Sequence, residues 1–147
     1  MQRRLILLCA VLSPLSPMVA QAEPDETIVR AMSTNTGLTS DQIRRYYNAC
    51  DSGGTLEMKI CANYRWRVQD ARLNKIYKQA LTSAKEAGRE RPLVRAQRAW
   101  LTYRDASCTY EGKAYAEGGT AEGLFVLSCM EELTKQRADR LEASLRE

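Results

Sequence analysis

The 147-residue sequence contains no histidine, and it has no pair of cysteines in a C-x-x-C arrangement. Histidine is the usual base beside a serine or cysteine nucleophile and a frequent zinc ligand, so its absence excludes those arrangements. Only aspartate and glutamate remain for acid–base chemistry, and no spacing singles out a carboxylate pair. We therefore expect no metal, no cofactor and no catalytic residue. An enzyme that uses two carboxylates is kept as a third alternative.

An excess of one charge is also missing, because 22 basic residues face 18 acidic ones. Without Arg3 and Arg4, which lie in the expected signal peptide, the net charge is +2. This balance is too mild to predict binding to nucleic acid or to an anionic membrane. The aromatic residues fall on the expected inner faces of helices, which also argues against single-stranded nucleic acid.

Long apolar runs are absent except at the start of the chain. Arg3 and Arg4 precede a short apolar run from Leu5 to Leu12, and Ala20-Gln21-Ala22 is a small-x-small cleavage site. This pattern is typical of a secretory signal peptide over residues 1–22. In a rival interpretation Cys9 would be lipidated, but the residue before it is Leu8, which is not small. We expect a periplasmic or secreted protein without a membrane anchor.

Four cysteines remain after the signal peptide: Cys50, Cys61, Cys108 and Cys129. In an exported domain they predict two disulfides rather than a four-thiolate zinc site. Cys108 and Cys129 each lie ten residues from the Gly118-Gly119 pair, so they face each other in a helical hairpin centred there. Cys50 and Cys61 flank the Gly53-Gly54 turn in a similar way. The spacing therefore predicts the pairs Cys50–Cys61 and Cys108–Cys129.

The rest of the sequence predicts an all-α fold, a small antiparallel bundle of three long helices and a short N-terminal one. Residues 23–39 have weak periodicity, and we expect a flexible leader with at most one helical turn. A domain over residues 40–147 then begins with a short helix to about residue 49. Long helices are expected over about 56–87, from near Pro92 to 117, and 121–146, with apolar residues three or four apart.

Polar residues lie on one of these apolar stripes. Leu93, Gln97, Trp100, Arg104 and Cys108 recur at steps of three or four, and the cysteine fixes their face toward the core. Buried polar groups need partners, which the neighbouring helices can supply. We expect a structural polar core made of Asp70, Asn74, Gln97, Trp100, Arg104 and Arg137.

Several segments resemble the pattern of LprI-type lysozyme-inhibitor domains. They are "CANYRWRVQDARLNKIY" (61–77), "AQRAWLTYRDASC" (96–108), "GGT" (118–120) and "CMEELTKQRADRL" (129–141). The resemblance covers roughly residues 50–141 and implies a helical, disulfide-bonded domain of the cell envelope. It also implies inhibition of lysozyme, the activity of the member that names the family. The chain departs from the pattern at Gln69, where a small residue is usual, and in lacking a lipid anchor.

The charge distribution points to a surface for such a partner. Residues 105–132 carry six carboxylates against one lysine, whereas residues 84–104 carry six basic residues against two acidic ones. Lysozymes are typically basic, so the acidic end of the bundle is expected to bind, through Glu111, Glu117, Gly118, Gly119 and Glu122. We expect an exported protein that inhibits a lysozyme-like muramidase by non-covalent masking. The alternative is an envelope interaction module with an unidentified protein partner.

Overall fold

The computed structural model describes residues 23–146, and all regular structure in this range is helical. Five helices follow one another: α1 (Glu26–Thr36), α2 (Ser40–Asn48), α3 (Thr55–Glu86), α4 (Glu90–Ala116) and α5 (Glu122–Ser144). The all-α prediction is confirmed for this part of the chain. The expected signal peptide lies outside the described residues. None of the described helices is long and apolar enough to span a bilayer.

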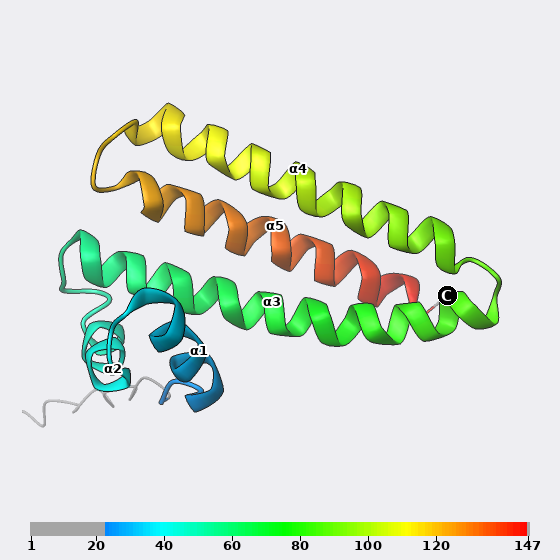
Figure 1. The fold of residues 1–147 in the computed structure, drawn as a ribbon, viewed down its shortest axis with the longest axis horizontal. Coiled ribbons are helices and arrows are strands. Elements are labelled where there is room, and N and C mark those ends of the chain that lie inside the picture. Colours follow the sequence, from blue (N-terminus) through cyan, green and yellow to red (C-terminus); the bar gives the residue numbers. More distant parts are fainter. Residues whose placement is uncertain (1–22, 147) are drawn as a thin grey trace, which may run out of the picture.

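The three long helices form an elongated bundle in which α5 lies between α3 and α4 (Figure 1). Helix α4 runs antiparallel to both neighbours, whereas α3 and α5 run in the same direction. The most extensive interface joins this parallel pair, and α3 touches α4 much less. The prediction of an antiparallel bundle is therefore correct only for successive helices. The parallel pair places the first turns of α3 and α5 at the same end.

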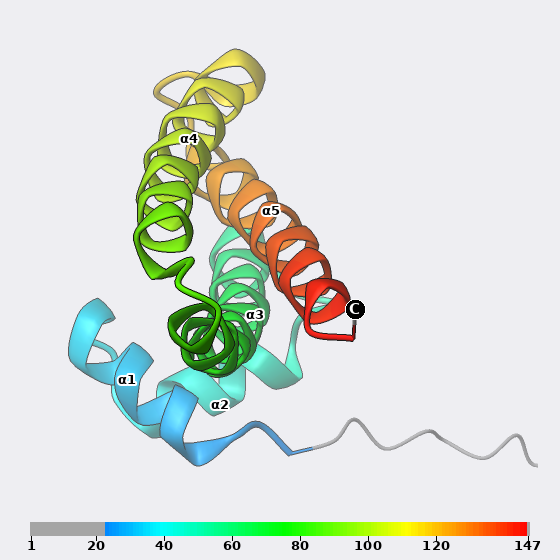
Figure 2. The same cartoon turned by 90° about the vertical axis from the view of Figure 1, so that its right-hand side faces the viewer.

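The N-terminal region differs from its prediction, because it contains two short helices instead of one. Within residues 23–39, expected to be a flexible leader, Glu26–Thr36 forms α1, and Val29 and Met32 of this helix are completely buried. The side chain of Asp25 caps α1 by accepting hydrogen bonds from the backbone N–H groups of Thr27 and Ile28. An 11-residue helix is marginal alone, so packing against α2 and α3 supplies its stability. Figure 2, which looks down the axis of α3, shows α1 and α2 below α3, with α2 extending across it, away from α4.

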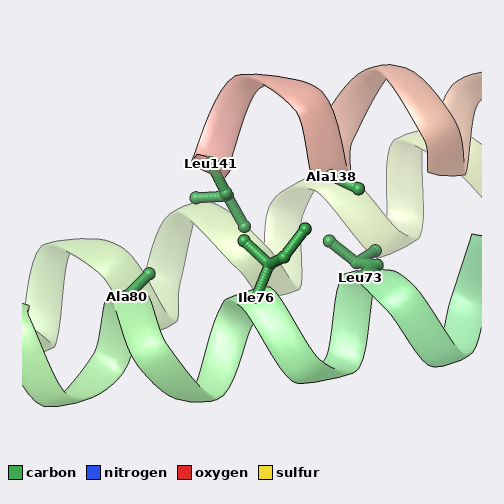
Figure 3. Close-up of a cluster of buried hydrophobic side chains, with 5 residues drawn as sticks. All are labelled: Leu73, Ile76, Ala80, Ala138 and Leu141. Atoms are coloured by element: carbon green, nitrogen blue, oxygen red, sulfur yellow. The ribbon is translucent and has the colours of Figure 1, made fainter. Parts of the chain in front are cut away.

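Two apolar clusters hold these parts together. The bundle cluster joins α3 to α5 through Leu73, Ile76, Ala80, Ala138 and Leu141 (Figure 3). The N-terminal cluster joins α1 and α2 to α3 through Val29, Met32, Ile43 and Ile60. Burying a side chain of this size stabilises the fold by about 1.5–3 kcal/mol. The two clusters therefore anchor different stretches of α3, residues 73–80 and the first turns.

Both predicted disulfides are present. Cys50–Cys61 ties the segment after α2 to the second turn of α3, with 5.9 Å between the Cα atoms. Cys108–Cys129 joins α4 to α5, with 5.4 Å between the Cα atoms. Cys61 and Cys108 are almost completely buried, so each bridge lies against the packed interior.

Candidate functional site

The polar stripe of α4 contributes to a layer between the three long helices. Arg104 is only 6% exposed, and its Nη1 lies 3.4 Å from the hydroxyl of the buried Thr134 on α5. The same nitrogen is 3.8 Å from an Asp70 oxygen on α3. The shorter contacts of Arg104 go to the neighbouring Asp105, whose Oδ1 accepts from Nε at 2.9 Å and lies 2.8 Å from Nη2. Arg104 therefore links all three helices.

The remaining predicted members of the polar core lie beside Arg104. Arg137 Nε donates to Gln97 Oε1 at 3.0 Å, and Asn74 Nδ2 donates to Asp70 Oδ2 at 3.1 Å. The Trp100 ring lies against two guanidinium groups, 5.2 Å from that of Arg104 and 5.9 Å from that of Arg137. Cation–π contacts of this kind are attractive. The structure thus brings the six residues together, while their purely structural role stays a prediction.

Two further polar atoms of α3 lie buried near this layer without a hydrogen-bond partner among the described residues, Trp66 Nε1 and Gln69 Oε1. Leaving such a group unpaired costs about 1–3 kcal/mol. The polar layer is therefore not fully satisfied at this point.

The expected binding residues lie around the α4–α5 turn. Glu117, Gly118 and Gly119 are exposed, and Gly118 has the left-handed φ of 69° that favours glycine. Glu122 and Glu111 are half-buried instead. Glu122 Oε2 accepts a hydrogen bond of 2.8 Å from the Gly118 N–H, so this carboxylate holds the turn as well as contributing charge.

Aromatic side chains near this turn are exposed, which corrects the expectation that the aromatics face inward. Tyr110 and Tyr115 of α4 are 73% and 71% exposed, and Phe125 of α5 is 39% exposed. Tyr115 and Phe125 stack with ring centroids 5.2 Å apart. Gly112 permits this close approach of the helices, because a Cβ there would lie 2.4 Å from Val126 Cγ2. A helical wheel could have placed Tyr110 opposite Cys108, whereas Tyr115, seven residues after Cys108, falls on the same helical face as that cysteine and gave no such signal.

The Gly53-Gly54 turn lies at the same end of the bundle as the Gly118-Gly119 turn (Figure 1). We call this end the glycine-turn end. The start of α3 adjoins the start of α5 there, since a Cβ on Gly123 would lie 3.0 Å from Lys59 Cε. Leu56, in the first turn of α3, is 47% exposed. The glycine-turn end thus combines exposed apolar side chains with carboxylates.

A salt-bridge cluster marks the other half of the α3–α5 interface. Arg72 of α3 contacts Asp139 at 2.5 Å and Glu142 at 2.6 Å, both on α5. The hydrogen bond from Arg72, followed by that from Lys135, lowers the pKa of Asp139. The pKa of Arg72 is raised, chiefly by its hydrogen bond to Asp139. These half-buried ion pairs link the two helices, and a further α3–α5 pair, Arg65–Glu131 at 3.0 Å, lies nearer the glycine-turn end.

Comparison with known proteins adds two findings. The family model described as "Lysozyme inhibitor LprI" matches residues 47–141, a range that includes both disulfides, the polar layer and the α4–α5 turn. The uncharacterized protein R02472 of Rhizobium meliloti (strain 1021) is 36% identical over 98 residues, which is 58% of this chain and 70% of that protein. No solved structure matches the chain.

Proposed function

Because the chain belongs to the LprI lysozyme inhibitor family, we propose that it is an exported protein that binds a basic, lysozyme-like muramidase and masks it without covalent chemistry. The glycine-turn end is the proposed contact surface. Binding there would cover the partner's substrate cleft by steric exclusion. The two disulfides support export, because such bonds persist in oxidising compartments.

The observation that carries this proposal is the exposed stack of Tyr115 and Phe125. Aromatic side chains supply much of the binding energy in protein interfaces, where they lie at the centre and polar groups form the rim. Here the exposed carboxylate of Glu117 follows α4 directly, and the half-buried Glu111 and Glu122 lie nearby in sequence. An apolar centre with an acidic rim is complementary to a basic surface.

The opposite end of α4 has a different composition. Arg89, Arg91, Arg95 and Arg98 lie in or just before its first three turns, and all four are exposed. None of the large exposed hydrophobic side chains of the described residues lies in this stretch. That end would repel a basic partner, so charge alone favours the glycine-turn end for the encounter.

The test separates the aromatic and the charged contributions. We expect Tyr115→Ala to speed dissociation from a basic lysozyme by about tenfold, because a central aromatic contact is lost. Glu117→Lys should mainly slow association, and the difference from the unmodified protein should shrink as salt rises past a Debye length of ~8 Å. Surface plasmon resonance measures both rates, and lysis of cell walls reports inhibition. Glu122 is avoided because its change would also disturb the turn.

The matched control is the double variant Arg91→Glu/Arg95→Glu, which reverses charge at the other end of α4. It should bind no more slowly than the unmodified protein. If both Tyr115→Ala and Glu117→Lys inhibit normally, the contact surface lies elsewhere. If the unmodified protein inhibits none of a panel of lysozymes, the partner is a different protein and the proposed activity is wrong.

A further inference from the structure

A small groove lies between α4 and α5, away from the glycine-turn end. Its volume is about 180 Å³, and its walls are formed by Trp100 and Tyr103 of α4 and by four residues of α5, Leu133, Gln136, Arg137 and Arg140. Tyr103 is 59% exposed. The groove therefore combines two aromatic side chains, two guanidinium groups and a side-chain amide in a small space.

The positive charge of Arg137 in this groove lacks a carboxylate partner. Its Nε donates to Gln97 and its guanidinium lies over the Trp100 ring, but no ion pair forms with any acid of the described residues. Two other bridging arginines behave differently, because Arg72 and Arg104 each contact two carboxylates. Arg137 is thus a half-buried cation without a counter-charge.

Arg140 adds a second positive charge one helical turn away. Burial, followed by repulsion from Arg140, lowers the pKa of Arg137, in keeping with a half-buried Arg137 that lines the groove beside an exposed Arg140. The neighbouring acid Asp139 is held by Arg72 and Lys135. Glu132 accepts the hydrogen bond of Gln136 and does not line the groove. Within residues 23–146, no carboxylate forms an ion pair with either arginine.

We propose that this groove binds a carboxylate carried on a sugar ring. The guanidinium groups of Arg137 and Arg140 hold the carboxylate, because their paired N–H donors match the geometry of its two oxygens. The attached ring packs against Tyr103 and the accessible edge of Trp100, and Gln136 offers a side-chain oxygen to ring hydroxyls. A lining of aromatic side chains with a few converging polar groups is usual for small-molecule sites, and this groove, at about 180 Å³, is smaller than the ~300–1,000 Å³ of drug-sized pockets and suits contact with a single ring. This site is independent of the proposed inhibitor surface.

The experiment compares two sugars that differ mainly in the carboxylate. N-acetylmuramic acid carries an O-lactyl carboxylate that N-acetylglucosamine lacks. We expect N-acetylmuramic acid to shift the indole N–H resonance of Trp100 and the backbone amides of residues 133–140 in a saturable way, with a dissociation constant of about 1 mM. N-acetylglucosamine should leave these resonances unchanged at the same concentration.

Variants connect the shifts to the two arginines. Arg140 is exposed, so Arg140→Gln should keep the fold and weaken binding by about tenfold. Arg137→Lys keeps the charge but loses the paired donors, and it should weaken binding as well. The control Arg95→Gln makes the same charge change at an exposed position outside the groove and should bind normally.

Three results would overturn the proposal. Equal shifts with N-acetylglucosamine would mean that the groove does not recognise the carboxylate. If inorganic phosphate bound as tightly as N-acetylmuramic acid, the sugar ring would not contribute to binding. Absence of saturable shifts with N-acetylmuramic acid would mean that the groove is no binding site for this class of ligand.

Discussion

The two halves of the long bundle are stabilised by different means and present different surfaces. The half at the glycine-turn end contains both disulfides and exposes Tyr115 and Phe125. The other half is held by the bundle cluster and the Arg72 salt bridges, and its exposed surface on α4 is basic.

The difference indicates how disulfides and a small apolar core share the stabilisation of a small domain. Apolar side chains that face a partner do not contribute to the domain's own interior, and a disulfide can replace part of that lost stabilisation. Cys108–Cys129 lies just inside the exposed aromatic pair on the same two helices. The bridge thus holds α4 against α5 next to the point where Tyr115 and Phe125 are exposed to solvent.

The largest effect is expected in the half that depends on apolar packing. Leu73 is 2% exposed, and Leu73→Ala should lower the free energy of unfolding by about 2–5 kcal/mol through lost burial and the cavity left behind. Leu101→Ala is the control, because Leu101 is 37% exposed and should lose far less. Urea denaturation followed by circular dichroism measures both. Equal losses would mean that the bundle cluster is not the main apolar support.

The next effect concerns the half at the glycine-turn end, which contains both disulfides. Replacing both cysteines of the Cys108–Cys129 bridge by serine should lower stability by roughly 3 kcal/mol, since the bridge closes a loop with a sequence separation of 21. Removing Cys50–Cys61 should destabilise the fold by about 0.5 kcal/mol less than removing Cys108–Cys129, because its sequence separation of 11 closes a shorter loop. Hydrogen exchange should accelerate first in the last turns of α4. Faster exchange in residues 73–80 instead would contradict the division into two halves.

A smaller effect is expected where the two halves meet, at the polar layer. Arg104→Ala should destabilise the fold by about 1–3 kcal/mol, because Thr134 loses a hydrogen-bond partner and Trp100 a cation–π contact. Arg98→Ala is the control on the exposed side of the same helix. The midpoint of thermal unfolding reports the change. Unchanged stability combined with lost partner binding would make Arg104 a binding residue instead of a core residue.

The smallest effect is a pH dependence in the half with the salt bridges. The hydrogen bond from Arg72 lowers the pKa of Asp139 below its ordinary value of 3.8. Asp139 therefore adds stability above that value, and the contribution is lost as the pH falls through the lowered folded pKa. Asp139→Asn should reduce the urea midpoint slightly near neutral pH, and the two proteins should converge in acid. A difference that persists after acid has protonated Asp139 in both the folded and the unfolded protein would contradict this origin.

Helices and disulfides could be predicted because their signals are local. The Gly53-Gly54 and Gly118-Gly119 pairs mark turns, and each is flanked by a pair of cysteines, equidistant from the turn only for Cys108 and Cys129. The polar stripe could be predicted too, because Arg104 shares the helical phase of Cys108. The carboxylate nearest to Arg104 was harder to predict, since it depends on side-chain rotamers; the structure places Asp105 closer than Asp70.

Other features depend on tertiary structure and left little signal in the sequence. The periodicity around Val29 and Met32 is too short to predict α1, which needs the surfaces of α2 and α3. The parallel packing of α3 on α5 could not be predicted from the distances of residues to a turn, because that reasoning pairs only consecutive helices. Tyr115 is exposed although it falls on the same helical face as Cys108, so a periodic pattern alone points it inward.

The direction of α5 has a practical consequence for surface attachment. The helix begins at the glycine-turn end and finishes at Ser144 at the far end of the bundle (Figure 1). A biotin or a fusion partner attached beyond Ser144 would therefore orient every molecule on a sensor chip or display particle the same way. The aromatic and acidic end would point into solution, and the length of the bundle would act as the spacer.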